Sequence, residues 1–207
     1  MIDVVDLTRS YGRVQALRGV SLRVEPGERV CLLGHNGAGK STLMKILAGQ
    51  LLPTSGSVRV GGVDVAADPD GARRALGFVP EEPALYDYLT AREFLELVVA
   101  LRGAGTVEEG LAIADLGADA ERLVREYSQG MRRRTALAAA LVARPPALVL
   151  DEALNGLDPP SSARVRDILR QRAEEGAAVL LSTHVLELAQ AFATRVVVLE
   201  KGLLREG

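Results

Sequence analysis

The residue types that hold a nucleotide phosphate occur together in one glycine-rich run, Gly34-His35-Asn36-Gly37-Ala38-Gly39-Lys40-Ser41-Thr42. Its glycines let the backbone turn tightly, so that successive N–H groups point inward toward an anion. Lys40 supplies a positive charge for the β- and γ-phosphates, and the Ser41 hydroxyl is a ligand for Mg2+. The apolar run 29–33 precedes this loop and a helical apolar pattern over 42–49 follows it. This strand–loop–helix context is the one that identifies a phosphate-binding P-loop.

Two acidic residues, Asp151 and Glu152, directly follow a second apolar run over residues 147–150. A parallel strand delivers its carboxyl end to the ligand crevice, so we expect Asp151 to bind in the Mg2+ shell. Glu152 is one residue further along and points elsewhere, where its carboxylate can polarise an attacking water. Four apolar residues before the pair argue against a simple surface turn.

A third apolar run, residues 177–181, ends in Ser182-Thr183-His184. A histidine at this position can donate a hydrogen bond to a γ-phosphate oxygen. A lone histidine at the start of a helix more often has no such role. The position of His184 at the end of a third core strand favours the functional interpretation.

A further anion site is indicated where Ser128 opens a helix expected over Met131–Val142. The free N–H groups at the helix start and the Ser128 hydroxyl form this site. The arginines at 132–134 could instead suggest a nucleic-acid contact. Successive helical positions point in different directions, so we favour a solvated or ion-paired face for them.

Tyr11 is expected in the loop between the first two strands, in a chain with only 3% aromatic residues. It could stack on a nucleotide base, a contact worth about 1–3 kcal/mol. It could equally be an edge tyrosine that covers the core, and the sequence leaves both interpretations open.

The elements around these residues indicate an α/β fold in a single domain over residues 1–207. Apolar strands that alternate with helices predict a mostly parallel central sheet covered on both faces. An N-terminal antiparallel β subdomain is expected from residues 2–7 and a strand pair over 14–24, and 195–199 is expected to be the last strand. We assign residues 1–82 and 145–207 to the core. An inserted α-helical subdomain is expected over about 83–144, and its first helix is expected to open with a capping box at Thr90. In the core, a further helix is expected to begin behind Asp158.

The composition limits the partners and the compartment. The chain has 25 Lys+Arg against 27 Asp+Glu, a net charge of −2, and so gives no support for a nucleic-acid partner. Its one cysteine, Cys31, excludes an internal disulfide and is expected to be buried, in a reducing compartment. The N-terminus lacks the layout of a signal peptide, and no uncharged apolar run reaches the length of a membrane span. We expect a soluble chain that reaches a membrane only through a partner.

The ordered set of motifs resembles the ATP-binding subunit of ATP-binding cassette (ABC) proteins over essentially the whole chain. The serine-x-glycine motif that opens a helix is the discriminating element, because many other P-loop enzymes share the rest. The resemblance implies ATP and Mg2+ as cofactors, Glu152 as general base and His184 at the γ-phosphate. It also implies a head-to-tail dimer, with a second copy or a homologous cassette, that sandwiches two ATP molecules. The residues that this dimer would use besides the glycine-rich loop are Tyr11 against adenine, Ser128, Gln129 and Gly130 from the opposite subunit, and Asp158 bridging the dimer.

Three departures from the family pattern stand out. Glu81 occupies the position of a glutamine that helps to hold Mg2+ and water; a carboxylate can still ligate Mg2+ but adds negative charge beside the phosphate. The signature reads Ser128-Gln129-Gly130-Met131 in place of Ser-Gly-Gly-Gln, a variant similar to exporter-type cassettes that pair with separate membrane subunits. Ala153 replaces the proline that commonly follows the general base. None of the three removes a residue that the chemistry requires.

The expected function is that of an ATP-hydrolysing subunit at the cytoplasmic face of the cell membrane, where it drives a separate integral membrane permease. We place its coupling surface at residues 81–97, where Leu85, Tyr86 and Tyr88 offer apolar contacts. Packing of those tyrosines within the helical subdomain is the open alternative. A soluble ABC ATPase acting on ribosomes or DNA is disfavoured, because the chain has one cassette and no sustained heptads. A small-molecule kinase would not need the signature motif, and a catalytically dead cassette would not retain Lys40 with Glu152.

Overall fold

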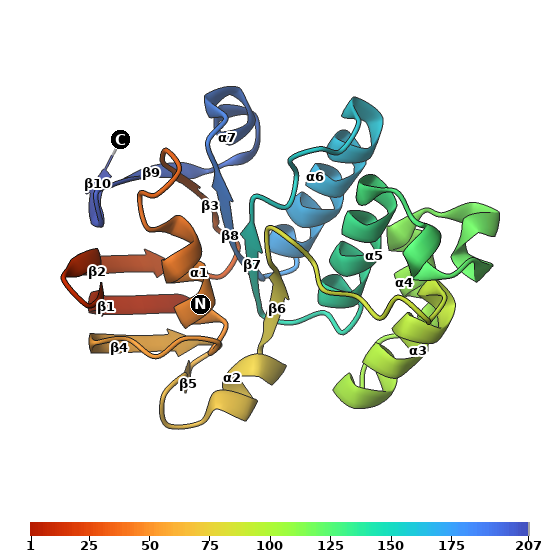
Figure 1. The fold of residues 1–207 in the computed structure, drawn as a ribbon, viewed down its shortest axis with the longest axis horizontal. Coiled ribbons are helices and arrows are strands. Elements are labelled where there is room, and N and C mark those ends of the chain that lie inside the picture. Colours follow the sequence, from red (N-terminus) through yellow and green to blue (C-terminus); the bar gives the residue numbers. More distant parts are fainter. Residues whose placement is uncertain (207) are drawn as a thin grey trace.

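Two β-sheets with a helix between them carry the glycine-rich loop, and a layer of helices covers the far side of the larger sheet (Figure 1). The computed structural model describes residues 1–206. An antiparallel sheet has the strand order β2-β1-β4-β5, and a six-stranded sheet has the order β10-β9-β3-β8-β7-β6. The strands are β1 (Ile2–Tyr11), β2 (Val14–Val24), β3 (Arg29–Leu33), β4 (Ser55–Val60), β5 (Val63–Asp64), β6 (Leu76–Val79), β7 (Ala147–Asp151), β8 (Ala178–Thr183), β9 (Arg195–Glu200) and β10 (Leu203–Glu206). The helices are α1 (Lys40–Leu47), α2 (Pro69–Arg74), α3 (Ala91–Arg102), α4 (Val107–Ala114), α5 (Gln129–Leu141), α6 (Pro159–Glu174) and α7 (Leu186–Phe192), with short 3-10 turns at Gly117–Glu121 and Val124–Glu126.

The larger sheet is parallel from β9 through β3, β8 and β7 to β6. All residues of β7 and β8 are buried. Strands that bury both faces need apolar side chains at every position, which is why they appear in the sequence as continuous apolar runs. The predicted α/β fold with a mostly parallel central sheet is therefore confirmed.

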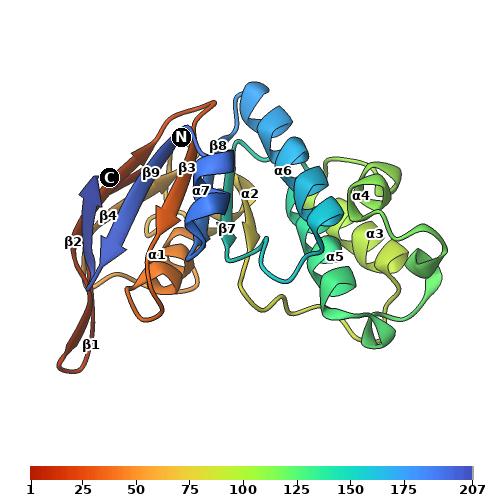
Figure 2. The same cartoon turned by 90° about the horizontal axis from the view of Figure 1, so that it is seen from above.

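The helices on the two faces of this sheet build separate cores. Helix α1 buries Leu43, Met44 and Leu47 in the core that lies between the two sheets. Helices α5, α6 and α7 cover the opposite face, where Leu137 and Leu169 are fully buried against the sheet. Figure 2, seen from above, shows the resulting order of antiparallel sheet, α1, parallel sheet and outer helices. The glycine-rich loop is thus held at the start of a helix that is buried on both sides.

The predicted helical insertion forms the outer part of the molecule. Thr90 caps the start of helix α3. Its hydroxyl accepts a hydrogen bond from the Glu93 N–H, and the Glu93 carboxylate accepts one from the Thr90 N–H, so the capping box is confirmed. A small core buries Leu95 of α3 with side chains of the neighbouring helices. Helix α5 contributes to both cores, with Leu137 facing the sheet and Ala138 facing the insertion. No helix within residues 1–206 is both long enough and apolar enough to cross a membrane.

Cys31 lies in β3 and is a free, fully buried thiol. Burial raises the pKa of this thiol to about 12, because the thiolate would lose its hydration. The side chain therefore stays protonated and packs as a small apolar group.

Three details of the β-structure differ from the sequence expectation. Residues 14–24 form one strand and not a pair, and Tyr11 is the last residue of β1 and not part of a loop. The reason is a two-residue turn with Gly12 at φ 58, after which pairing resumes at once between Tyr11 and Val14. The strand at 195–200 is followed by β10, which Lys201 and Gly202 turn back onto β9 with φ values of 48 and 78.

Leu95 and Leu101 allow a matched test of the helical core, since both lie on α3. Leu95 is 0% exposed and Leu101 is 77% exposed. We expect Leu95→Ala to lower the free energy of unfolding by about 2–5 kcal/mol, through lost apolar contact and the cavity left behind. Leu101→Ala should change the same quantity by less than about 0.5 kcal/mol. Urea denaturation followed by circular dichroism measures both, and equal losses would contradict the packing described.

Candidate active site

A cavity of ≈ 400 Å3 lies at the carboxyl edge of the parallel sheet. The strands β3, β8, β7 and β6 lie side by side, so the loops that follow them meet at this edge. The cavity is lined by His35, Asn36, Gly37 and 39–42 of the glycine-rich loop, by Ala16 and by Glu81, Glu152 and His184. The structure thus brings together side chains that the sequence selected from four separate segments.

The glycine-rich loop has a shape that larger residues would not allow. Gly39 has φ 110, and a Cβ on it would lie 2.6 Å from the Ala16 carbonyl oxygen. A Cβ on Gly34 would lie 2.6 Å from the Leu199 carbonyl oxygen. Gly37 also has a positive φ, of 81, but its Cβ would meet nothing within 4 Å. The loop therefore packs directly against the neighbouring backbone. Helix α1 begins at Lys40, so its N-terminus lies at the cavity.

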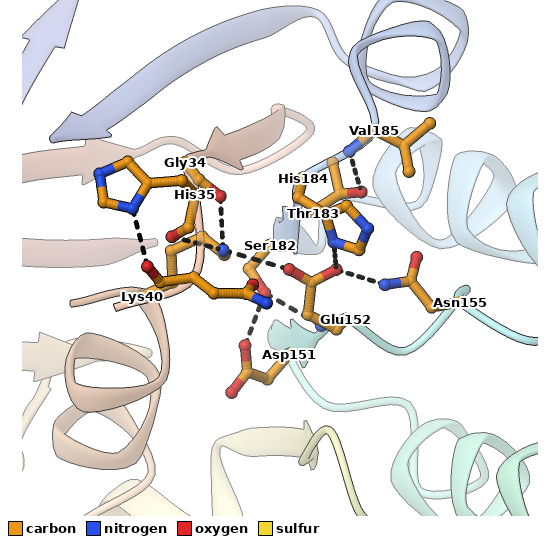
Figure 3. A network of polar contacts seen from close by, with 11 residues as sticks. Gly34, His35, Lys40, Asp151, Glu152, Asn155, Ser182, Thr183, His184 and Val185 are labelled. Carbon is orange, nitrogen blue, oxygen red and sulfur yellow. Dashed lines mark hydrogen bonds and ion pairs between the residues drawn. The ribbon is translucent and has the colours of Figure 1, made fainter. Parts of the chain in front are cut away.

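Lys40 and Glu152 form a buried ion pair inside the cavity (Figure 3). The Lys40 Nζ lies 3.2 Å from the Glu152 Oε1, and both side chains are 6% exposed. The same ammonium donates a hydrogen bond of 2.6 Å to the Gly34 carbonyl oxygen. Opposite charges that face one another in this way avoid the cost of an isolated buried charge. A phosphate that entered the cavity would compete with Glu152 for this ammonium.

The second oxygen of the Glu152 carboxylate has two further partners. The Asn155 Nδ2 donates to Glu152 Oε2 at 2.5 Å, and the His184 Nδ1 lies 3.2 Å from the same oxygen. The Glu152 backbone is in the left-handed region, with φ 49, and its N–H donates to the Ser182 hydroxyl at 2.9 Å. This arrangement turns the Glu152 side chain toward the glycine-rich loop, away from its neighbour Asp151.

Asp151 lies beneath the cavity, 2% exposed at the end of β7. Its Oδ1 accepts a hydrogen bond of 2.6 Å from the Ser182 hydroxyl on the paired strand β8. Ser41 and Glu81, the other two predicted metal ligands, line the cavity itself. Within residues 1–206 there is no cluster of three or more His, Cys, Asp or Glu side chains that could hold a metal ion alone. The donor set, a few oxygens beside a phosphate cradle, fits Mg2+ that arrives with a nucleotide.

Several predicted site residues lie outside the lining of this cavity in the described chain: Tyr11, Ser128, Gln129, Gly130 and Asp158. Tyr11 is 47% exposed, and the Arg9 guanidinium lies 4.7 Å from the centre of its ring. Ser128 caps α5 by accepting a hydrogen bond of 3.2 Å from the Met131 N–H. Asp158 caps α6 in the same way, and its hydrogen bonds with Ser161 lower the pKa of the Asp158 carboxyl. The binding roles of these residues stay predictions.

The three consecutive arginines have partners on different elements, and one of them is ion-paired as expected. Arg132 forms a salt bridge of 2.8 Å with Asp87, and Arg134 donates to the Asp115 carbonyl oxygen at 2.7 Å. Arg133 donates to the Glu81 carbonyl oxygen at 2.7 Å. This last bond ties the helix that begins behind Ser128 to the segment that carries Glu81.

Sequence reasoning did not assign roles to Arg133, Ser182 or Asn155. The partner of Arg133 is 52 residues away in sequence, so no local pattern reveals it. Ser182 could have been found from the strand order, because the parallel register of β7 and β8 pairs it with Asp151. Asn155 follows Glu152 by three residues, a spacing that a turn brings together.

The two glycines with positive φ in the loop provide a paired test of the phosphate cradle. Gly37→Ala introduces only the cost of an unfavourable backbone conformation, about 1–2 kcal/mol. Gly39→Ala adds a clash with the Ala16 backbone. We therefore expect Gly39→Ala to weaken nucleotide binding by roughly a further tenfold or more, which is about 1.4 kcal/mol. Titration with a fluorescent ADP analogue measures both affinities, and equal affinities for the two variants would contradict the geometry of the cradle.

Comparison with known proteins agrees with this geometry. The profile of a family described as ABC transporter matches residues 17–155. The chain is 38% identical over 208 residues to the uncharacterized ABC transporter ATP-binding protein YxlF of Bacillus subtilis (strain 168), a match that covers 98% of this chain and 68% of that protein. It is 38% identical over 213 residues to the daunorubicin/doxorubicin resistance ATP-binding protein DrrA of Streptomyces peucetius, covering 100% of this chain and 64% of that one. The chain thus spans about two thirds of the length of these two relatives.

A solved structure shares both the fold and part of the sequence. It is a dimeric structure of the ATP-binding cassette MJ0796 in a post-hydrolysis state, bound to ADP and Pi. The TM-score is 0.90 at 28% sequence identity, and the match covers 100% of this chain and 98% of that chain. Given the phosphate cradle, the paired lysine and glutamate and these matches, the chain belongs to the ABC transporter family, whose cassettes bind ATP with Mg2+ and hydrolyse it.

Proposed function

We propose that the chain is the ATP-hydrolysing subunit of an exporter-type ABC transporter and drives a separate membrane permease from the cytoplasmic face of the membrane. The observation that carries this proposal is the buried pair of Lys40 and Glu152 in the cavity of the glycine-rich loop. A phosphate-binding cation and a carboxylate base are thereby held within reach of the same phosphate. The names of two relatives, a daunorubicin/doxorubicin resistance protein and a bacitracin transport protein, support the export role.

Different residues of the site bind the nucleotide and hydrolyse it. Backbone N–H groups of residues 34–42 and the Lys40 ammonium bind the phosphates. Ser41, Glu81 and Asp151 hold Mg2+, which neutralises phosphate charge when it is bound. Glu152 accepts the proton of the attacking water, because its carboxylate reaches into the cavity from the end of β7. His184 orients the γ-phosphate.

A complete site needs a second cassette. In this proposal Tyr11 stacks on the adenine and Asp158 bridges the dimer, while Ser128, Gln129 and Gly130 reach the nucleotide held by the opposite subunit. The exposure of Ser128, Gln129 and Asp158 supports this arrangement, since these residues are free to meet a partner. The dimeric form of the MJ0796 cassette supports it further.

The permease docks on the groove between the core, residues 1–82 and 145–207, and the helical subdomain at about 83–144. A cavity of ≈ 330 Å3 lies there, with an apolar lining that includes Phe78, Leu85 and Phe94. Tyr86 and Tyr88 follow the lining residue Leu85 in sequence and are 61% and 79% exposed. The Tyr86 ring lies 6.1 Å from the Phe94 ring, centre to centre, so Tyr86 is anchored while its outer face stays open. An apolar, partly filled groove of this kind suits a short helix of a membrane protein.

Replacement of Glu152 by glutamine tests the general base. Glu152→Gln keeps the shape of the side chain but removes the proton acceptor, so we expect ATP hydrolysis to fall by roughly 100-fold or more. The variant should still bind ATP and accumulate as an ATP-bound dimer in size-exclusion chromatography. Lys40→Ala is the contrasting variant, because it should lose nucleotide affinity itself. Normal turnover by Glu152→Gln would refute the assignment.

Replacement of both exposed tyrosines tests the docking surface. We expect Tyr86→Ala with Tyr88→Ala to abolish stimulation of the ATPase by the co-purified permease in lipid vesicles. Basal hydrolysis should remain, because neither ring lines the nucleotide cavity in the described chain. Leu186→Ala, a change at a 47% exposed side chain on α7, is the control and should leave both rates unchanged. If the basal and stimulated rates of the tyrosine variant fall together, the rings belong to the fold and not to the interface.

A further inference from the structure

The Glu152 carboxylate has three side-chain partners in the described chain, and they differ in what a nucleotide would do to them. Lys40 Nζ lies 3.2 Å from Oε1, while His184 Nδ1 at 3.2 Å and Asn155 Nδ2 at 2.5 Å approach Oε2 (Figure 3). Lys40 and His184 both line the cavity. Asn155 is not part of that lining. In the proposed function both Lys40 and His184 turn to phosphate oxygens, which leaves the carboxylate with one of its present partners.

We propose that Asn155 is the positioning residue that keeps the Glu152 carboxylate aimed once nucleotide has drawn Lys40 and His184 away. The inference rests on the proposed function and extends it to a residue outside the cavity. Asn155 carries no charge, so bound phosphates do not pull its amide from the carboxylate. Its hydrogen bond to Oε2 leaves Oε1, now released by Lys40, as the oxygen that receives the proton of water. A donor that holds an ionised carboxylate forms one of the stronger hydrogen bonds of a protein.

The backbone around Glu152 makes this contact a fixed one. The Asn155 N–H donates to the Glu152 carbonyl oxygen at 3.1 Å and closes a turn of four residues. Glu152 itself has φ 49, and its N–H is held by the Ser182 hydroxyl at 2.9 Å. Both residues of the Asn155–Glu152 contact therefore lie on one short segment that these hydrogen bonds hold in place. The side chain of asparagine has few rotatable bonds, so little freedom is lost when it holds this position.

Three variants separate positioning from fold and from binding. Asn155→Ala removes the donor, and Asn155→Asp replaces it by a carboxylate of the same shape that repels Glu152. Gln171→Ala is the matched control, because Gln171 also donates an amide hydrogen bond to a carboxylate, Glu175 at 3.0 Å, on the exposed face of α6. We expect kcat for ATP to fall at least tenfold in Asn155→Ala and further in Asn155→Asp. KM for ATP should stay within about twofold in both, and the control should match the unaltered protein.

Two further measurements do not depend on the turnover of the loaded enzyme. In a 15N-labelled protein the side-chain amide signal of Asn155, identified by its loss in Asn155→Ala, should shift in Glu152→Gln and keep its position when Mg2+ and a non-hydrolysable ATP analogue are added. Affinity for a fluorescent ADP analogue should be unchanged by Asn155→Ala. A third comparison does use hydrolysis. In the Glu152→Gln background Asn155→Ala should cause no further loss of residual hydrolysis, because the two residues act as one unit.

The outcomes distinguish this inference from the proposed function. If the unaltered protein hydrolyses no ATP, or if Glu152→Gln hydrolyses it normally, the proposed function fails. If those tests succeed and Asn155→Ala keeps its kcat, or loses nucleotide affinity, the positioning role is refuted. An Asn155 amide signal that moves on addition of Mg2+ and the non-hydrolysable ATP analogue to the value seen in Glu152→Gln also refutes it. An unchanged signal with reduced kcat and unchanged affinity supports it.

Discussion

The arrangement of the strands and loops around the site depends on the buried contact between the Lys40 ammonium and the Glu152 carboxylate. Two charges that are each 6% exposed are tolerated only when hydrogen bonds satisfy both. Backbone carbonyls of the glycine-rich loop serve the ammonium, and an amide and an imidazole serve the carboxylate. These contacts require the ends of β3 and β7 to lie one strand apart, with β8 between them. Ser182 lies in β8, and His184 directly follows it. The strand order of the sheet therefore determines which residues lie beside the ion pair.

The outer helices and the parallel sheet are joined by helix α5 and by the side chain of Arg133. Helix α5 buries side chains in both cores and begins directly after Ser128. Arg133 on the same helix holds the carbonyl of Glu81. A shift of α5 would therefore displace the segment that carries Glu81, one of the residues that line the cavity.

Much of this arrangement could be predicted from the sequence, since its cause is local. The glycine-rich loop, the buried strands and the caps at Thr90, Ser128 and Asp158 each depend on residues within a few positions of one another. The β-structure near both ends of the chain was harder to predict, because two-residue turns at Gly12 and Lys201 continue the strand pairing beyond the apolar pattern. The partners of Arg133, Ser182 and His184 depend on strand order and layer packing, which no short pattern contains. The sequence could predict which segments line the cavity, but it could not predict the side-chain contacts between those segments.

The protonated, buried thiol of Cys31 makes this protein well suited to site-directed labelling. It is the one cysteine in the sequence, and it is shielded from maleimide reagents as long as the fold is intact. A cysteine introduced at an exposed position therefore takes up a dye or spin label without a cysteine-free background having to be made. Spectroscopic distances between cassettes can then be recorded on a protein whose own strand β3 is unaltered.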